Sequence, residues 1–144
     1  MFQRILLAWD GSEVALRAFD LAIDLTRRYG GELHAVSIAN SPAHAETTSD
    51  RTESSDAAHG YLQSSFDQVK DRAERAGVDV EHRILDGEAP ARTLIAYAHE
   101  HGFDLVVCGA HPARRAGRLL LRGVAQDLIA DGATPVLVVG EEER

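Results

Sequence analysis

The sequence predicts a single α/β domain whose parallel sheet is covered by helices on both sides. Apolar runs of strand length alternate five times with segments of helix length. Short connections between such elements favour a mostly parallel sheet with both faces covered. No internal repeat or linker divides the 144 residues, so we expect one domain, residues 1–144.

The first strand and helix have clear end signals. Phe2–Trp9 is an apolar run that ends at Asp-Gly-Ser, which is typical of a strand buried on both faces. Ser12 can then cap a helix whose apolar residues recur at helical spacing as far as Tyr29. Gly30-Gly31 ends this helix, and Leu33–Ala39 is the second strand.

The segment Asn40–Asp56 (NSPAHAETTSDRTESSD) has no apolar periodicity and is rich in polar residues. Its length and polarity predict a mobile excursion, the last part of which can form the start of the next helix. The remaining elements follow in strict alternation. They are a helix over 62–76 ended by Gly77, a strand Val78–Leu85, a helix from Pro90 closed by Gly102, a strand Phe103–Cys108, a helix Leu120–Ala130 and a strand Pro135–Val139.

Composition excludes several classes of partner. The net charge of −8 and the pI of about 5.3 disfavour non-specific binding to DNA, RNA or anionic lipid. No apolar run approaches the ~20 residues that cross a bilayer, and the charged first strand does not read as a secretory signal. The single Cys108 cannot form an internal disulfide, which fits a reducing compartment. We therefore expect a cytoplasmic protein with no nucleic-acid or membrane partner.

Asp10 is the first residue that could carry chemistry, because it follows the carboxyl end of the first strand. A carboxylate there can bond a ribose hydroxyl, act as a phosphoacceptor, or simply form the turn that ends the strand. Trp9 beside it can pack in the core or contact adenine. Phosphoacceptor chemistry requires further acidic residues next to Asp10, and WDGSE does not supply them before the turn.

The stretch from Gly109 to Val124 is the second candidate. Glycines here suit a loop that approaches phosphate, although Pro112 lacks an N–H and Arg122 takes positive φ less readily than glycine. His111 is the histidine expected near a ligand. The stretch also concentrates guanidinium groups, which are well suited to phosphate, in an otherwise acidic chain. They belong to Arg114, Arg115, Arg118 and Arg122, and the alternative is that they only keep an exposed loop soluble.

Other residues give weaker signals. His99 and His101 lie two residues apart in a predicted helix, so they do not face the same metal ion. Cys108 falls in a predicted buried strand and reads as a small core residue. Ser12 lacks the strand-turn-helix elbow of a nucleophile, and no general base can be assigned. We therefore expect neither a metal site nor an enzyme.

Three long stretches together resemble the universal stress protein family. They are ILLAWDGSEVALRAFDLAIDLTRRYGGELHAVSI, GEAPARTLIAYAHEHGFDLVVCGAH and RLLLRGVAQDLIADGATPVLVV, in the family's order and spacing. The resemblance implies a Rossmann-like fold with a five-stranded parallel sheet of order 3-2-1-4-5. It also implies a homodimer formed by antiparallel pairing of the last strand, Pro135–Val139.

Many members of that family bind ATP through the motif G-x2-G-x9-G-[S/T]. Laid on this sequence without a gap, the motif falls on Gly109, Pro112, Arg122 and Gly123, of which only Gly109 matches. The family's adenosine pocket corresponds, residue by residue, to Ala8, Trp9, Asp10, Ile38, Gly109 and Val124.

Two functional hypotheses follow from the resemblance. The first is a stress-response dimer that acts through contact with an unknown partner protein, with nucleotide absent or incidental. The second is a switch that binds ATP or another adenine nucleotide, with Arg114, Arg115 or Arg118 on the phosphates and at most slow hydrolysis. An enzyme of the related adenine-nucleotide α-hydrolase group is disfavoured, because WDGSEVAL contains only Gly11 where those enzymes have a glycine-serine-rich loop.

Overall fold

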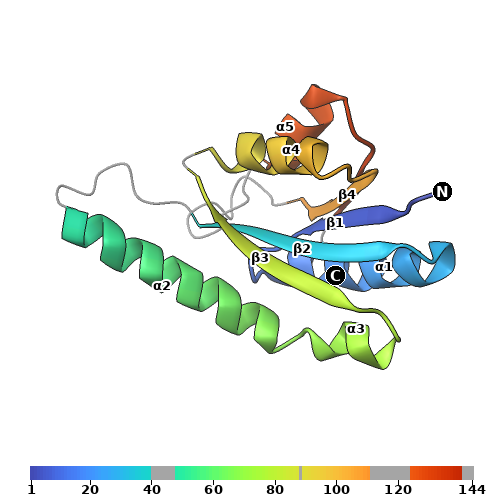
Figure 1. Cartoon of the computed structure of the whole chain (residues 1–144), viewed down its shortest axis with the longest axis horizontal. Coiled ribbons are helices and arrows are strands. Elements are labelled where there is room, and N and C mark those ends of the chain that lie inside the picture. Colours follow the sequence, from blue (N-terminus) through green and yellow to red (C-terminus); the bar gives the residue numbers. More distant parts are fainter. Residues whose placement is uncertain (40–47, 88, 111–123, 141–144) are drawn as a thin grey trace.

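The fold is built on a five-stranded parallel sheet of order β3-β2-β1-β4-β5 (Figure 1). The computed structural model describes residues 1–39, 48–87, 89–110 and 124–140. The strands are β1 (Arg4–Ala8), β2 (Glu32–Ala39), β3 (Val80–Asp86), β4 (Leu105–Gly109) and β5 (Val136–Val139). Every neighbouring pair is parallel, which confirms the predicted topology.

Helices cover both faces of this sheet, as predicted (Figure 1). One face carries α1 (Glu13–Tyr29), α2 (Thr48–Asp67) and α3 (Asp71–Arg75), and the other carries α4 (Pro90–Glu100) and α5 (Val124–Asp131). The chain therefore changes faces after β3 and returns to pair β4 with β1. The carboxyl ends of β1 and β4 meet where the order of the strands reverses, which is the usual ligand crevice of open α/β sheets.

Strand β1 supplies apolar side chains to two separate cores. Ile5 and Leu7 share one core with Phe19 of α1, whereas Leu6 and Ala8 belong to the core beneath α4 and α5. Side chains of a strand alternate between faces, so a strand buried on both sides must be apolar throughout. The continuous run ILLAW meets this requirement.

The predicted helix ends are confirmed by their caps. The Ser12 hydroxyl oxygen accepts a hydrogen bond from the Ala15 N–H at 3.2 Å. Gly30 ends α1 with φ 67°, in the left-handed region that glycine enters without a steric penalty. Pro90 occupies the first turn of α4, as expected.

In the segment Asn40–Asp56, residues 48–56 belong to helix α2, which confirms the helical start expected in its last part. Residues 40–47 lie outside the described part of the chain. The sequence of this stretch has no apolar periodicity, yet it extends a helix that is already anchored further along, and propagation of a helix costs far less than nucleation. Figure 1 shows the start of this helix extending past the carboxyl ends of β2 and β3.

The bounds of two further helices are compared with those predicted from the sequence. The helix expected over 62–76 is divided into α2 and α3 by a turn at residues 68–70, after which Ala73 packs into the core beside α1. Of the helix expected over Leu120–Ala130, only the part from Val124 lies within the described residues. In the described part of the chain, no helix has the length and apolar character needed to cross a membrane.

Candidate functional site

The turn between β1 and α1 places a buried carboxylate at the crevice. Asp10 is 3% exposed, and its Oδ1 accepts hydrogen bonds from the Ser12 N–H at 2.9 Å and from the Ser12 hydroxyl at 2.5 Å. Gly11 between them has φ 83°, which only glycine adopts at little cost. These bonds fix the turn that precedes the positive end of the α1 dipole.

Gly109 ends β4 on the other side of the same crevice. A Cβ built on Gly109 would lie 2.7 Å from Val14 Cγ1 and 3.0 Å from Val14 Cγ2. The backbone of β4 therefore packs directly on the first turn of α1, close to the Asp10 turn. The family's ATP motif assigns Gly109 to a phosphate loop, and the structure shows that Gly109 also packs against α1.

The other predicted pocket residues lie on two different faces of the sheet. Ala8 and Ile38 are buried together in the core beneath α4 and α5. The Trp9 ring, 2% exposed, lies on the opposite face and packs edge-on against Phe19 and Phe66, with centroid separations of 6.2 and 5.6 Å. In this structure Trp9 borders the crevice through its backbone, while its ring belongs to the core.

The rest of the predicted site lies outside the described residues. His111, Arg114, Arg115, Arg118 and Gly123 are in the segment 111–123, and Val124 is described only as the first backbone position of α5. Their proximity to Asp10 stays a prediction. Within the described residues, no three His, Cys, Asp or Glu side chains are grouped so as to hold a metal ion.

A chain of buried polar contacts runs beneath the end of β1. The Ser37 hydroxyl donates to the Trp9 carbonyl at 2.7 Å and lies 2.8 Å from His82 Nε2. Because the single hydroxyl proton is used on Trp9, His82 Nε2 carries the proton and donates to Ser37 Oγ. The His82 ring also lies against Phe66, with centroids 4.4 Å apart. Burial lowers the pKa of His82 from 6.5 to about 4, partly opposed by the nearby negative charge of Asp67.

Acidification is therefore expected to destabilise the fold through His82. Between about pH 6.5 and pH 4 the unfolded chain binds a proton at this residue and the folded chain does not, so the free energy of unfolding falls as the pH falls. Since the ring is only partly buried, solvent screening reduces the expected loss to about 1–2 kcal/mol. Urea unfolding across this range measures it. His82→Gln should flatten the slope, and an unchanged slope would contradict this origin.

Cys108 precedes Gly109 on β4 and is buried. Burial raises the pKa of its thiol to about 11, so almost no reactive thiolate exists near neutral pH. At about pH 8, Ellman's reagent should modify the native protein at least roughly 100-fold more slowly than the protein in urea. Equal rates in the two states would show that the end of β4 opens readily.

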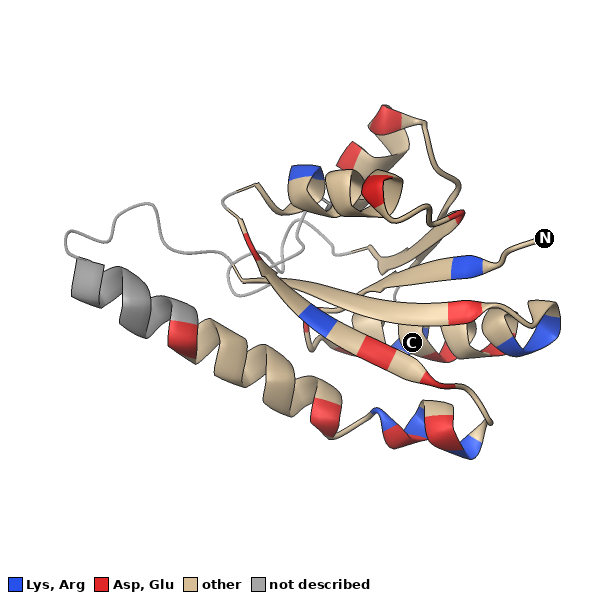
Figure 2. Cartoon of the chain, viewed as in Figure 1, with Lys and Arg blue, Asp and Glu red and all other residues tan. Residues whose placement is uncertain are grey.

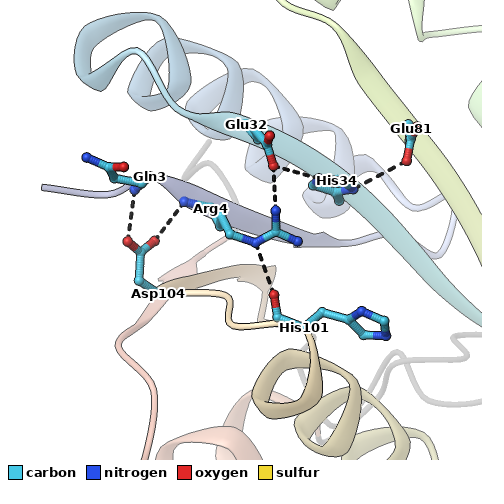
Figure 3. Close-up of polar contacts among 7 residues, drawn as sticks. All are labelled: Gln3, Arg4, Glu32, His34, Glu81, His101 and Asp104. Carbon is cyan, nitrogen blue, oxygen red and sulfur yellow. Dashed lines mark hydrogen bonds and ion pairs between the residues drawn. The ribbon is translucent and has the colours of Figure 1, made fainter.

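A polar cluster joins the strands at their amino ends, opposite the Asp10 turn (Figure 3). The Asp104 carboxylate accepts hydrogen bonds from the Gln3 and Arg4 N–H groups at 2.9 and 3.1 Å. The Arg4 guanidinium contacts Glu32 at 2.6 Å and the His101 carbonyl at 3.0 Å. The Arg4 and Glu32 side chains are open to solvent to 37% and 61%, so their ion pair contributes little, and the evident effect of the cluster is to hold β1, β2 and β4 in register.

Two of the clefts lined by described residues contain none of the predicted site residues. One, of about 690 Å³, lies at the amino ends of β2 and β3 between Gly30 and Glu81. The other, of about 550 Å³, lies between α4 and α5 beside Arg92 and Asp131. The first cleft is at the end of the sheet opposite the carboxyl ends of β1 and β4.

The structure also brings one unexpected residue to the crevice. Tyr61 of α2 lies with its hydroxyl group over Gly11, where a Cβ would be only 2.5 Å from the Tyr61 oxygen. The two residues are 50 positions apart, and the only sequence signal was an aromatic residue next to Leu62 in a predicted helix.

The strand order, the two helical layers and the crevice between β1 and β4 define a Rossmann-like α/β protein. The chain belongs to the universal stress protein family, whose family model matches residues 1–140. A universal stress protein of Methanocaldococcus jannaschii is 29% identical over 146 residues, covering 100% of this chain and 85% of the relative.

Solved structures agree with this assignment. A protein of the universal stress protein family from Burkholderia pseudomallei superposes with a TM-score of 0.78 and 27% identity, covering 96% of each chain. A universal stress protein solved in complex with cAMP has a TM-score of 0.71 and 27% identity, covering 96% of this chain and 97% of that one.

Proposed function

We propose that this protein is a non-enzymatic stress-response regulator that binds an adenine nucleotide at the crevice between β1 and β4. The observation that carries the proposal is the pairing of a buried Asp10 turn with the close approach of Gly109 to α1 at the point where the strand order reverses. The cAMP complex of the 27% identical relative supports the choice of ligand class.

The proposal divides recognition between two parts of the crevice. The nucleoside part contacts the ends of β1 and β2, where Asp10 and the backbone of Trp9 lie. The phosphates reach the segment that follows Gly109, where Arg114, Arg115 and Arg118 supply charge-assisted hydrogen bonds. In the proposal the nucleotide acts as a bound signal with at most slow hydrolysis, and among the described residues we assign no catalytic base to the crevice.

Calorimetric titration with Mg-ATP, AMP, cAMP and adenosine at low ionic strength tests the proposal. Micromolar binding of at least one of these ligands is expected, and a folded protein that binds none of them would refute it. Replacing Arg114, Arg115 and Arg118 together by alanine should weaken ATP about tenfold or more and leave adenosine unchanged. An unchanged ATP affinity would show that these arginines do not contact the phosphates.

Association through β5 is a second proposal, carried by the contrast between the two edges of the sheet. The edge strand β5 consists of four apolar residues, VLVV, whose side chains are mostly half-buried. The other edge, β3, carries exposed Glu81 and Arg83, and Figure 2 shows these charges along it. Charged edges resist strand pairing and apolar edges invite it, so we infer a homodimer through Pro135–Val139.

Light scattering coupled to gel filtration measures the dimer. The wild-type protein should elute with twice the mass of one chain. Leu137→Lys on β5 should give a monomer, whereas Ile84→Lys on β3 serves as the matched edge control and should stay dimeric. A wild-type monomer at about 10 μM would overturn the dimer without affecting the nucleotide proposal.

A further inference from the structure

The carboxyl half of α2 is fastened to the face of the sheet that carries Trp9. Leu62 and Phe66 are fully buried there, and the Trp9 indole N–H donates to the Ser65 hydroxyl at 3.0 Å. Ser65 lies four residues after Tyr61, so the two residues share one side of the helix. These contacts fix where the Tyr61 side chain projects.

Tyr61 projects onto the turn that follows β1. A Cβ on Gly11 would lie 2.5 Å from the Tyr61 hydroxyl oxygen, 3.0 Å from Cζ and 3.1 Å from Cε2, so the phenol end of the ring covers the Gly11 backbone. Two constraints therefore require glycine at position 11, namely the backbone φ of 83° and the Tyr61 phenol, which occupies the space of a Cβ. The contact places an aromatic residue of α2 over the turn that joins Asp10 to Ser12.

The phenol is available to a ligand in two ways. Tyr61 is 54% exposed, so part of its ring faces solvent beside the crevice. Its hydroxyl takes part in none of the hydrogen bonds among the described residues, whereas Asp10 Oδ1 and the Ser12 hydroxyl are already bonded to one another. A phenol hydroxyl can both donate and accept a hydrogen bond, and a ligand in the crevice can supply the partner.

The Tyr61 phenol is suited to contact the nucleoside part of a nucleotide. A neutral phenol adds no positive charge for phosphate, but its ring can stack on a base and its hydroxyl can bond a ribose hydroxyl or a ring nitrogen. We propose that Tyr61 is a specificity-determining residue that contacts the base or ribose of the bound adenine nucleotide. This inference rests on the function proposed above and extends its site from β1 and β4 to helix α2.

Two variants of Tyr61 test the inference by calorimetry with Mg-ATP and with adenosine. Tyr61→Phe removes only the hydroxyl and should weaken both ligands about threefold, whereas Tyr61→Ala also removes the ring and should weaken both about tenfold or more. Tyr29→Ala is the matched control, because Tyr29 is a similarly exposed tyrosine on α1 near the amino end of β2, and it should change neither affinity.

Tryptophan fluorescence checks that the variants keep α2 in place, since Trp9 is the only tryptophan and bonds to Ser65 on that helix. If Tyr61→Ala alters the Trp9 emission, α2 has moved in that variant, and the role of Tyr61 is then judged from the affinities of Tyr61→Phe. Wild-type binding that both variants retain in full would overturn the role of Tyr61 and leave the proposed function standing. A folded wild-type protein that binds none of Mg-ATP, AMP, cAMP and adenosine would overturn both the role of Tyr61 and the proposed function.

Discussion

Gly31→Ala is expected to lower the free energy of unfolding by about 2–3 kcal/mol, the largest effect of any single methyl addition considered for this chain. The new Cβ would lie 2.7 Å from two backbone carbonyl oxygens, those of Phe2 and Gln3. Backbone atoms cannot rotate away as a side chain can. The strain would fall on the Glu32 N–H to Gln3 carbonyl bond of 2.8 Å, which begins the pairing of β1 with β2.

The neighbouring Gly30→Ala is the natural control for that variant. Gly30 has φ 67°, but no atom lies within 4 Å of its added Cβ, so only the left-handed backbone is penalised, by about 1 kcal/mol. Urea unfolding of both variants separates a steric cost from a conformational one. If Gly30→Ala lowers the free energy of unfolding more than Gly31→Ala does, the steric contact with the Phe2 and Gln3 carbonyl groups is not the reason for glycine at position 31.

The strands and helix ends were predictable because their causes are local. The apolar run at β1 identifies a strand buried on both faces, and Ser12 and Gly30 cap α1 as their residue types indicate. The length of α2 was not predictable, because residues 48–56 carry no apolar stripe and are helical as an extension of the part anchored at Phe66.

The candidate site was less accessible to sequence reasoning, because its contacts join distant residues. Asp10 and Gly109 were found from their positions after β1 and β4, where parallel strands present ligands. The burial of the Trp9 ring and the position of Tyr61 both depend on how α2 docks, and no local pattern encodes that docking. The Ser37 and His82 contacts likewise join two strands 45 residues apart.

Gly109→Ala is expected to cost about 1–3 kcal/mol, because its Cβ would lie 2.7 Å from Val14 Cγ1 and 3.2 Å from the Val14 backbone carbon. Val14 is buried and β-branched, so its side chain has little freedom to turn away. Gly140→Ala is the matched control, because Gly140 follows β5 at the same carboxyl end of the sheet. No atom lies within 4 Å of its added Cβ, and its effect should stay within about 0.5 kcal/mol.

A double-mutant cycle with Val14→Ala then separates the two roles of Gly109. Removing the Val14 methyl groups vacates the space that the new Cβ needs, so the double variant should be at least about 1 kcal/mol more stable than the sum of the single changes predicts. Strictly additive losses would contradict the packing role. If the double variant is stable, its titration with ATP tests the second role of Gly109, the approach of its backbone to the phosphates. If affinity recovers with stability, the glycine serves packing against α1. If affinity stays low, the phosphates need the bare backbone at position 109.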